Sequence, residues 1–437
     1  MKRESFGSRL GFILVSAGCA IGIGNVWKFP YICGAYGGAA FILIYLLFLI
    51  ILGIPVLVCE FAVGRGSRKS VALSFDELQP KNGKWTPLKF IGIIGCYMLM
   101  MFYTTVGGWL MYYCYKGIRG SFVKASSDNI STQFTQMLTD VPTMLFWTIL
   151  ICVIGFAVCM FGLKNGIERV TKVMMTALIL IMVVLAIRSV TMAGAGEGIR
   201  FYLIPDFHKM VESGIGNVVF AALSQAFFTL SIGIGAMLIF GSYLDQSRSL
   251  TGEAVNIMLL DTFVALTAGF IIIPACFSYG IEPGAGPSLI FITLPNIFAQ
   301  MSGGRIWAFL FFLFLTFAAL STIIAVFENL VMFNMELLGW RRKKSVLVCA
   351  ALIIILSIPC VLGFNVWSGV QLLGEGSTIM DLEDFIVSNN LLPLGSLGYV
   401  LFCTRKNGWG WDAFIKEVNT GSGMKFPKTL RGYVSYG

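Results

Sequence analysis

The chain has 437 residues, of which 57% are hydrophobic and only 12% are charged, and its mean hydropathy is +0.84. A soluble protein of this length cannot bury so much apolar surface, so the composition indicates a polytopic membrane protein. The net charge of +9 at pH 7 is carried mainly by alternate loops, which indicates membrane topology and argues against nucleic acid as a partner.

Ten segments are apolar enough for membrane spans, taking a span as about 20 mostly apolar residues. In chain order they cover residues 10–34, 38–63, 88–116, 143–161, 170–190, 216–243, 254–280, 305–336, 345–363 and 379–403. These spans predict an all-α polytopic membrane protein with a single transmembrane domain over residues 1–404. Residues 405–437 include Trp409, Trp411 and Lys425 and are expected to form a cytoplasmic or interfacial tail.

Lysine and arginine are unevenly distributed among the loops. They gather at the N-terminus, in the tail, and in the loops at 65–89, 162–172 and 341–344. The loops at 119–142, 191–214, 281–304 and 364–378 carry few. Because positive loops stay in the cytoplasm and ten spans are an even number, both termini are expected to be cytoplasmic. The expected location is the plasma membrane, which in a bacterium is the inner membrane.

The first span contains the stretch AGCAIGIGNVWKFP at residues 17–30, whose glycines and Asn25 weaken the helix at mid-depth. Its tetrapeptide IGIG at 21–24 recurs at 232–235, inside the sixth span. Corresponding interruptions in two halves are typical of transporters built from inverted repeats. Glycine also lets membrane helices pack closely, which explains either motif taken alone. Their equivalent positions favour the repeat.

Each half then holds five spans, and because five is odd the halves have opposite orientations. Repeat one covers about residues 8–190 and repeat two about residues 214–404. In such a fold, half-helix N-termini attract an anionic substrate group, while freed carbonyls coordinate a cation such as Na⁺. Oxygen atoms, which suit hard cations, are supplied by the backbone near Gly18, Ala20 and Ile21 and by the side chains of Asn25, Thr229, Ser231, Ser321 and Thr322.

Other classes of function are less well supported by the residues. An enzyme is not expected, because the only histidine, His208, lies in a loop without a metal-binding pattern and the cysteines are scattered singly. A channel filter or charged pore ring is absent from the sequence. A sensor built on a transporter fold remains open, and substrate accumulation against a Na⁺ gradient distinguishes it from a transporter.

Several motifs together resemble the neurotransmitter:sodium symporter family, in its bacterial amino-acid branch. They are SRLGFILVSAGCAIGIGNVWKFPY, GGAAFILIYLLFLIILGIPVLVCEFAVGR, QAFFTLSIGIGAM and FAALSTIIAVFE, and the likeness runs from Arg3 to about Gly432. The resemblance implies the LeuT-type fold, with two inverted five-helix repeats and helices 1 and 6 unwound at mid-membrane. It also implies a sodium-coupled symporter that imports an amino acid by alternating access.

The resemblance assigns sodium and substrate sites residue by residue. The first sodium site would comprise Ala20, Asn25, Thr229 and Asp261, and the second Gly18, Ile21, Ala318, Ser321 and Thr322. The implied substrate-binding residues are Cys19, Ala20, Gly22, Gly24, Leu99, Tyr103, Phe228, Thr229, Ser231, Ile234, Ser321 and Val326. A pocket walled by Leu99, Ile234 and Val326 is apolar and favours a hydrophobic or aromatic amino acid. Without the resemblance, Tyr103 is more simply a packing aromatic.

Three departures from the family pattern refine this expectation. Gly22 stands where amine transporters have an aspartate, which favours an amino acid over a monoamine. Another small zwitterion is the alternative substrate. Asp261 stands where members commonly have asparagine, and Ala265 where chloride-dependent members have serine. A fixed carboxylate near Na⁺ would take over the role of chloride, so chloride is not expected to be required.

The resemblance also implies two gates. On the outside Lys28 would pair with Asp384 and close over Phe228 and Tyr103; lysine lacks the bidentate fork of the usual arginine, which predicts a looser gate. On the cytoplasmic side Arg3 would pair with Glu336, and Tyr243 would help to hold the end of helix 6. Considered alone, Arg3 is equally well explained as a residue that snorkels to the membrane interface.

Overall fold

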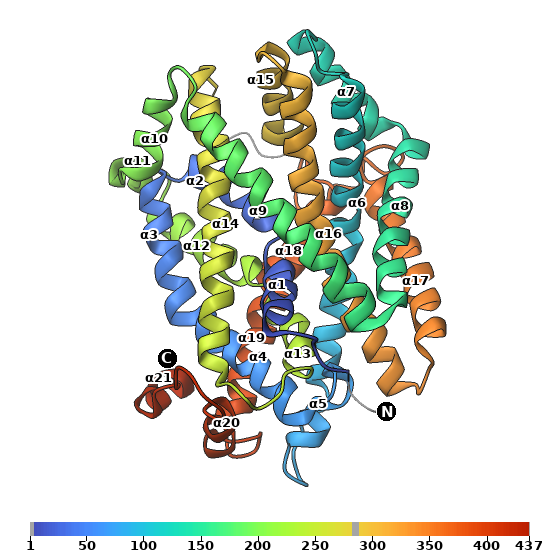
Figure 1. Ribbon diagram of the computed structural model, residues 1–437, viewed down its shortest axis with the longest axis vertical. Coiled ribbons are helices and arrows are strands. Elements are labelled where there is room, and N and C mark those ends of the chain that lie inside the picture. Colours follow the sequence, from blue (N-terminus) through green and yellow to red (C-terminus); the bar gives the residue numbers. More distant parts are fainter. Residues whose placement is uncertain (1–3, 282–287, 437) are drawn as a thin grey trace.

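The computed structural model describes residues 4–281 and 288–436, which form helices joined by loops (Figure 1). Among these residues there is no strand, and one isolated β-bridge joins Arg248 to Ser422. The first half contains α1 (Arg9–Ala20), η1 (Gly24–Lys28), α2 (Phe29–Ala35), α3 (Ala39–Phe48), η2 (Leu49–Gly53), α4 (Ile54–Ser67), α5 (Val71–Leu78), α6 (Leu88–Arg119), α7 (Ser127–Thr139), α8 (Val141–Met160), η3 (Leu163–Glu168) and α9 (Arg169–Val190).

Two short helices, α10 (Ala195–Leu203) and α11 (Phe207–Glu212), lead into the second half. That half contains α12 (Ile215–Thr229), α13 (Ala236–Gly241), α14 (Leu250–Ser278), η4 (Leu289–Thr293), α15 (Leu294–Gln300), α16 (Gly304–Leu337), α17 (Arg342–Leu362), α18 (Ile379–Ile386), η5 (Val387–Leu391) and α19 (Leu392–Thr404). The tail contains α20 (Trp411–Val418), η6 (Lys428–Leu430) and α21 (Arg431–Tyr436).

Eight helices in the described part of the chain are long and apolar enough to cross a membrane, and α1 with η1 and α2 makes a ninth, bent span. The prediction of an apolar helix is therefore confirmed for nine of the ten segments. The remaining segment, 216–243, was predicted as a span interrupted at its IGIG motif, and the structure divides it there into α12 and α13. Each of these helices is shorter than a spanning helix needs to be.

Both IGIG motifs lie where a helix is interrupted. The axis bends by 56° between α1 and the segment that starts at Gly24, because Ile21 takes an extended conformation with ψ at 95°. At the second motif, Gly233, Gly235 and the preceding Ser231 all have positive φ, which ends the helix. Glycine adopts this conformation without strain. The structure thus has the two interrupted helices that the sequence predicts.

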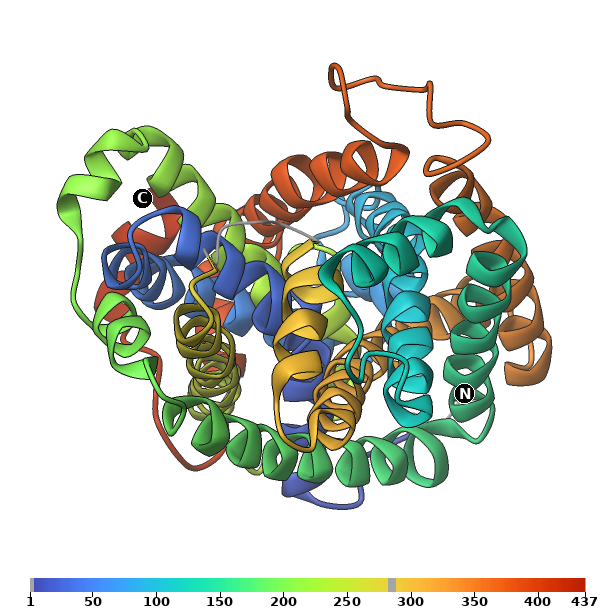
Figure 2. The same cartoon turned by 90° about the horizontal axis from the view of Figure 1, so that it is seen from above.

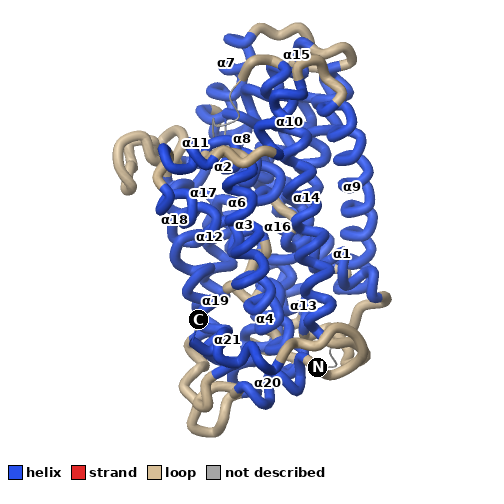
Figure 3. The backbone as a smooth tube through the Cα atoms, turned by 90° about the vertical axis from the view of Figure 1, so that its left-hand side faces the viewer, coloured by secondary structure: helices blue, strands red, loops and turns tan. Residues whose placement is uncertain are grey.

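Three of the segments predicted as loops contain short helices of their own. The helix α7 lies in the 119–142 segment, α10 and α11 lie in 191–214, and α15 lies in 281–304. Local capping explains two of them, since Ser126 accepts from the backbone N–H of Asn129 and Asp206 accepts from that of Lys209. These helices cover the end of the bundle opposite to the termini (Figures 1 and 3).

The centre of the bundle is built around α16, which packs along α6 and also contacts α1, α8 and α9. Most of α16 is buried, whereas α9 is largely exposed along its length. Figure 2 shows α9 running obliquely along one outer side, where it contacts α14 and α16. The two interrupted helices therefore face the long helices of the centre, and the groups freed at their breaks are shielded from the surroundings.

Both ends of the chain lie at the same end of the molecule (Figures 1 and 3). The tail is not extended: α20 packs against α4, and α21 packs against α19. Glu417 of α20 forms an ion pair of 2.6 Å with Arg65, and the Tyr433 hydroxyl donates to the Ile51 carbonyl. The tail is therefore anchored to the helical bundle by specific contacts.

Candidate binding site

The break after α1 turns backbone carbonyls toward hydroxyl groups of α16. Thr322 Oγ1 lies 3.3 Å from the Gly18 carbonyl oxygen and 3.4 Å from that of Ile21. Ser321 Oγ lies 3.4 Å from the Ile21 oxygen and 2.9 Å from the Ala318 oxygen. We refer to these five residues, all buried, as the Thr322 cluster. It gathers neutral oxygen atoms of the kind that bind hard cations.

A second buried group of oxygen atoms surrounds Asp261 on α14. Asn25 donates to Asp261 Oδ1 at 2.7 Å, and Thr229 donates to Oδ2 at 3.0 Å. We refer to these three residues as the Asp261 cluster. Asp261 is fully buried, and among the described residues it forms no ion pair with a lysine, arginine or histidine. Burying an ionised carboxylate is costly unless a positive charge compensates it, so this arrangement suits a bound cation.

A small cavity of about 10 Å³ lies between the two breaks. It is lined by Ala20, Gly22, Gly24, Leu99, Tyr103, Phe228, Ser231, Thr322 and Leu392. The Tyr103 hydroxyl accepts the backbone N–H of Ile23 at 2.8 Å, so it points at the break in the first helix. The cavity has room for about one water molecule, so an amino-acid side chain enters it only if a wall residue moves.

Seven of the twelve predicted substrate residues line this cavity. The five predicted residues that do not line it are Cys19, Thr229, Ile234, Ser321 and Val326. Ile234 and Val326 are fully buried but are not part of the lining. Leu392, at the start of α19, lines the cavity and was not predicted, because nothing in the local sequence indicates that this helix reaches the breaks.

The break in the second interrupted helix is held by a residue that the sequence analysis missed. Glu60 of α4 is fully buried and accepts the backbone N–H groups of Gly233 and, at 3.2 Å, of Met237. These N–H groups lose their helical partners at the break, so the carboxylate replaces the missing acceptors. The available signal was that Glu60 is the single charged residue in the apolar segment 38–63.

We expect Glu60→Gln to destabilise the protein by about 1–3 kcal/mol, because the amide presents an N–H group to one of the two backbone donors. Thermal unfolding of the purified protein in detergent measures this effect. Glu375→Gln is the matched control, since Glu375 is exposed in the 364–378 loop. Equal melting temperatures for the two variants would show that Glu60 does not hold the break.

The predicted outer gate residues lie together on the side away from the termini. Lys28 Nζ is 3.0 Å from Asp384 Oδ2 and lies 4.4 Å from the centre of the Phe228 ring. Ser388 also donates to Asp384, at 2.6 Å. A cavity of about 250 Å³, lined by Phe228 and Tyr103 among others, lies next to the ion pair. Phe228 and Tyr103 line both this outer cavity and the smaller one between the breaks, so they form the wall that the two share, whereas Lys28 and Asp384 line the outer cavity only.

Of the predicted inner gate, Arg3 lies outside the described residues. Its predicted partner Glu336 accepts from the backbone N–H and the hydroxyl of Ser70, both at 2.7 Å. Tyr243 donates to the buried carboxylate of Glu328 at 2.8 Å. Arg342 binds both oxygens of Glu328, at 2.8 and 2.9 Å. Sequence reasoning missed this second pair, although Glu328 interrupts an apolar segment.

Interrupted helices whose breaks face buried clusters of oxygen atoms are typical of one class, the secondary transporters with inverted repeats. A family model described as "Sodium:neurotransmitter symporter family" matches residues 3–133 and 128–382. The chain belongs to this family. It is therefore a sodium-dependent, multi-pass membrane transporter and not an enzyme.

Individual relatives agree with this assignment. The chain is 36% identical to the uncharacterized sodium-dependent transporter YhdH of Bacillus subtilis (strain 168), over 93% of this chain and 88% of the relative. It is 34% identical to an uncharacterized sodium-dependent transporter of Haemophilus influenzae, over 100% of this chain and 95% of the relative. The crystal structure of MhsT in complex with L-phenylalanine matches with a TM-score of 0.90 and 36% identity, covering 100% of this chain and 97% of that one.

Proposed function

We propose that this transporter is a secondary active symporter that imports an amino acid with Na⁺ by alternating access. The observation that carries the proposal is the Asp261 cluster, a buried carboxylate beside the break in the first helix with no basic partner among the described residues. The likeness to MhsT, whose structure contains L-phenylalanine, supports an amino acid as the substrate.

The proposal places one Na⁺ at the Asp261 cluster, with the Ala20 carbonyl as a further ligand. Asn25 and Thr229 already orient their side chains toward the carboxylate, so a cation entering there exchanges hydrogen bonds for oxygen ligands. The Gly22 N–H donates to Asn25 Oδ1 at 3.2 Å and keeps the amide in this orientation. Because the carboxylate supplies the anionic charge, transport is proposed to be independent of chloride.

The proposal places a second Na⁺ at the Thr322 cluster. Its ligands are neutral carbonyl and hydroxyl oxygens, so this ion is bound without a fixed negative charge. The cluster joins the broken first helix to α16, which is the central helix of the bundle. Binding of Na⁺ there would couple the ion to the relative position of these two helices, which alternating access requires.

The substrate is proposed to lie between the two clusters, in the cavity lined by Leu99, Tyr103 and Phe228. Its carboxylate would contact the first Na⁺, the Gly24 region and the Tyr103 hydroxyl. None of the described residues that line the cavity has an acidic side chain to receive an amine, so a substrate with its own carboxylate is favoured. The apolar wall suits a hydrophobic or aromatic side chain, which requires Leu99 or Phe228 to move outward. Another small zwitterion is the alternative.

The proposed orientation puts both termini and the tail in the cytoplasm, since the loops at that end carry most of the lysine and arginine. Residues 8–190 and 214–404 would then be the two inverted repeats of one transmembrane domain. The Lys28–Asp384 pair would be the outer gate, and the inner gate would involve Arg3, Glu336 and Tyr243.

A binding screen tests the proposed function. The thermal stability of the purified protein would be measured with each standard amino acid, in Na⁺ and in K⁺. We expect stabilisation by hydrophobic or aromatic amino acids in Na⁺ only. Asn25→Ala and Thr322→Ala should each weaken the Na⁺ dependence by about tenfold, while Thr176→Ala on the exposed side of α9 should not. Stabilisation that is equal in K⁺ would contradict the proposal.

For the outer gate we expect Lys28→Ala and Asp384→Ala to reduce the transport rate more than equilibrium binding. The ion pair is partly exposed, with 26% and 36% of the two side chains accessible, so its loss costs little stability. It closes the path to the outer cavity, so its loss should impair the transport cycle instead. Uptake and binding would be measured in parallel, with Lys28→Arg as the variant that keeps the charge. Wild-type uptake in both alanine variants would show that the pair is only a surface contact.

A further inference from the structure

The loop between α17 and α18 exposes a run of apolar side chains at the end of the molecule opposite to the termini. Every residue from 366 to 376 is exposed. Val366 and Leu372 keep 70% and 68% of their surface accessible, and the other large apolar residues of the run are Trp367, Val370 and Leu373. Residues 364–378 include one charged residue, Glu375. A contiguous apolar surface of this kind indicates an interaction partner.

Hydrogen bonds hold the 364–378 loop in a defined conformation. At its base, the Asn365 side chain donates to the Leu138 carbonyl of α7 at 3.0 Å, and the Trp367 N–H donates to the Leu362 carbonyl at 2.8 Å. Near its other end, the Ser377 hydroxyl donates to the Gly374 carbonyl at 2.6 Å. The apolar side chains are therefore carried by a folded turn structure that presents them outward.

The direction in which the loop projects identifies the partner. Figure 2 shows it projecting sideways from the bundle, on the side away from α9, and Figure 3 shows it below the level that α7 and α15 reach. The helix α11 lies at a similar level and exposes Phe207 and Val211. Two separate segments thus expose aromatic and aliphatic side chains at one depth, as proteins do at a membrane–water interface.

The apolar surface of the loop continues a surface that already faces lipid. The helix α17 is one of the membrane spans, and it exposes Leu347, Leu352 and Ile355 along its length. In a multi-pass membrane protein these side chains contact the acyl chains. Because the loop begins where α17 ends, its apolar residues extend the lipid-facing side of that helix.

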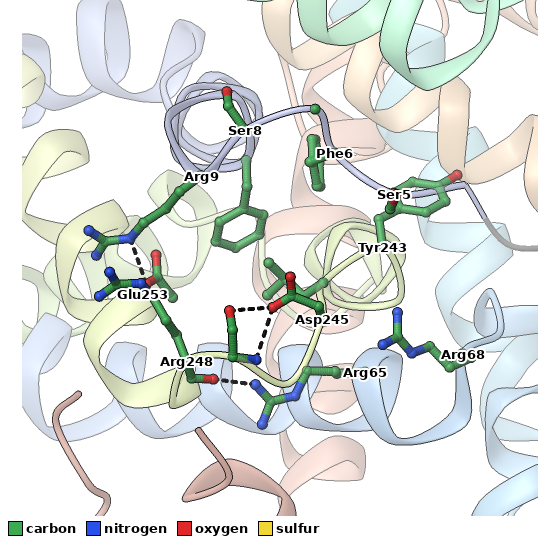
Figure 4. A pocket seen from close by; sticks show the side chains of 14 residues that line it. Ser5, Phe6, Ser8, Arg9, Arg65, Arg68, Tyr243, Asp245, Arg248 and Glu253 are labelled. Carbon is green, nitrogen blue, oxygen red and sulfur yellow. Dashed lines mark hydrogen bonds and ion pairs between the residues drawn. The ribbon is translucent and has the colours of Figure 1, made fainter. Parts of the chain in front are cut away.

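The end that holds the termini has a different surface chemistry. Arg9, Arg65, Arg68 and Arg248 line a cavity of about 310 Å³ there (Figure 4). Basic side chains of this kind make contact with a membrane sensitive to the charge of its lipids. The 364–378 loop has no lysine or arginine. Its contact with a membrane would come from the apolar side chains and would not need anionic lipids.

We propose that the 364–378 loop inserts its apolar side chains into the lipid surface beside the end of α17. Trp367 suits this depth, because its ring is apolar and its N–H can bond to a headgroup. The loop leads directly into α18, which carries Asp384, so the membrane would restrain that end of α18. The proposal goes beyond the transport function, because it assigns a partner to residues that the symport cycle does not use.

The test measures the depth of the loop in lipid vesicles. Val366→Cys and Leu372→Cys are each labelled with a small fluorophore, which is selective because the eleven native cysteines are buried. The full chain is reconstituted in phosphatidylcholine whose acyl chains carry bromine just below the headgroups. We expect the bromolipid to quench both positions about threefold more than a label at Thr132→Cys, and iodide in the water to quench them about threefold less.

Thr132→Cys is the matched control, because Thr132 is exposed on α7, which reaches further along the bundle axis (Figure 3). Replacing half of the lipid by phosphatidylglycerol should leave the quenching unchanged. Equal bromolipid quenching at all three positions would overturn the proposal. Protection from iodide without bromolipid quenching, increasing with the number of protein molecules per vesicle, would assign the surface to a second copy of the chain and would also overturn it.

Discussion

Asp261→Asn is expected to reduce sodium-driven uptake in chloride-free medium by about a hundredfold or more. Asp261 is fully buried and holds Asn25 and Thr229 by hydrogen bonds of 2.7 and 3.0 Å. Removing one member of a buried charge pair costs about 3–5 kcal/mol, because the other charge is left uncompensated. In this variant the uncompensated charge would be the proposed Na⁺. The asparagine preserves the shape of the side chain, so the loss would report the charge itself.

Uptake in proteoliposomes with gluconate in place of chloride measures this effect. The wild type should keep its activity in gluconate, because its own carboxylate supplies the negative charge. The double variant Asp261→Asn, Ala265→Ser should be weak in gluconate and partly rescued by chloride, since Ala265 lies one helical turn further along α14 and is also buried. A large loss of wild-type activity in gluconate would contradict the assignment of Asp261.

Gly22→Ala is expected to weaken amino-acid binding by about tenfold to a hundredfold. An added methyl group would lie 2.1 Å from the Tyr103 hydroxyl oxygen and 2.6 Å from Thr322 Oγ1. Neither distance is tolerated, so Tyr103 and the broken segment of the first helix would have to separate. The same movement would displace the carbonyl groups of the Thr322 cluster, so the affinity for Na⁺ should fall together with the affinity for the amino acid.

Isothermal binding titrations of the amino acid at several Na⁺ concentrations would test this expectation. Gly216→Ala is the matched control, because a methyl group at Gly216, near the start of α12, meets nothing within 4 Å. Binding by the Gly22 variant at wild-type affinity would mean that the cavity between the breaks is not the substrate site.

The interruptions of the two helices were predictable from the sequence, because glycine pairs at equivalent places in two apolar spans indicate broken helices without any tertiary information. The meeting of Asn25 with Asp261 was not predictable from spacing, since 236 residues separate them. It followed from the family resemblance. Hydropathy alone marks 216–243 as one continuous span, and only the second IGIG motif indicates the break that the structure has between α12 and α13.

The supporting residues were harder to predict than the clusters. Glu60 is the single charged residue of its apolar segment, and Glu328 is the single charged residue between Arg305 and Glu336; such a position signals a function but names no partner. Their partners, the backbone of residues 233 and 237 and the guanidinium of Arg342, are brought to them only by the packing of helices. The tail was predicted as an interfacial segment, and its ion pair with Arg65 likewise depends on tertiary structure.

The most direct test of the central claim is accumulation of a labelled amino acid by proteoliposomes that contain the purified protein. An inward Na⁺ gradient is imposed, and the amino acid is the one that stabilises the protein best in the binding screen. We predict accumulation above the external concentration, which collapses when a sodium ionophore dissipates the gradient and which is absent with K⁺ in place of Na⁺. Uptake that only equilibrates the amino acid, or that proceeds equally in K⁺, would contradict the assignment of this protein as a sodium-coupled symporter.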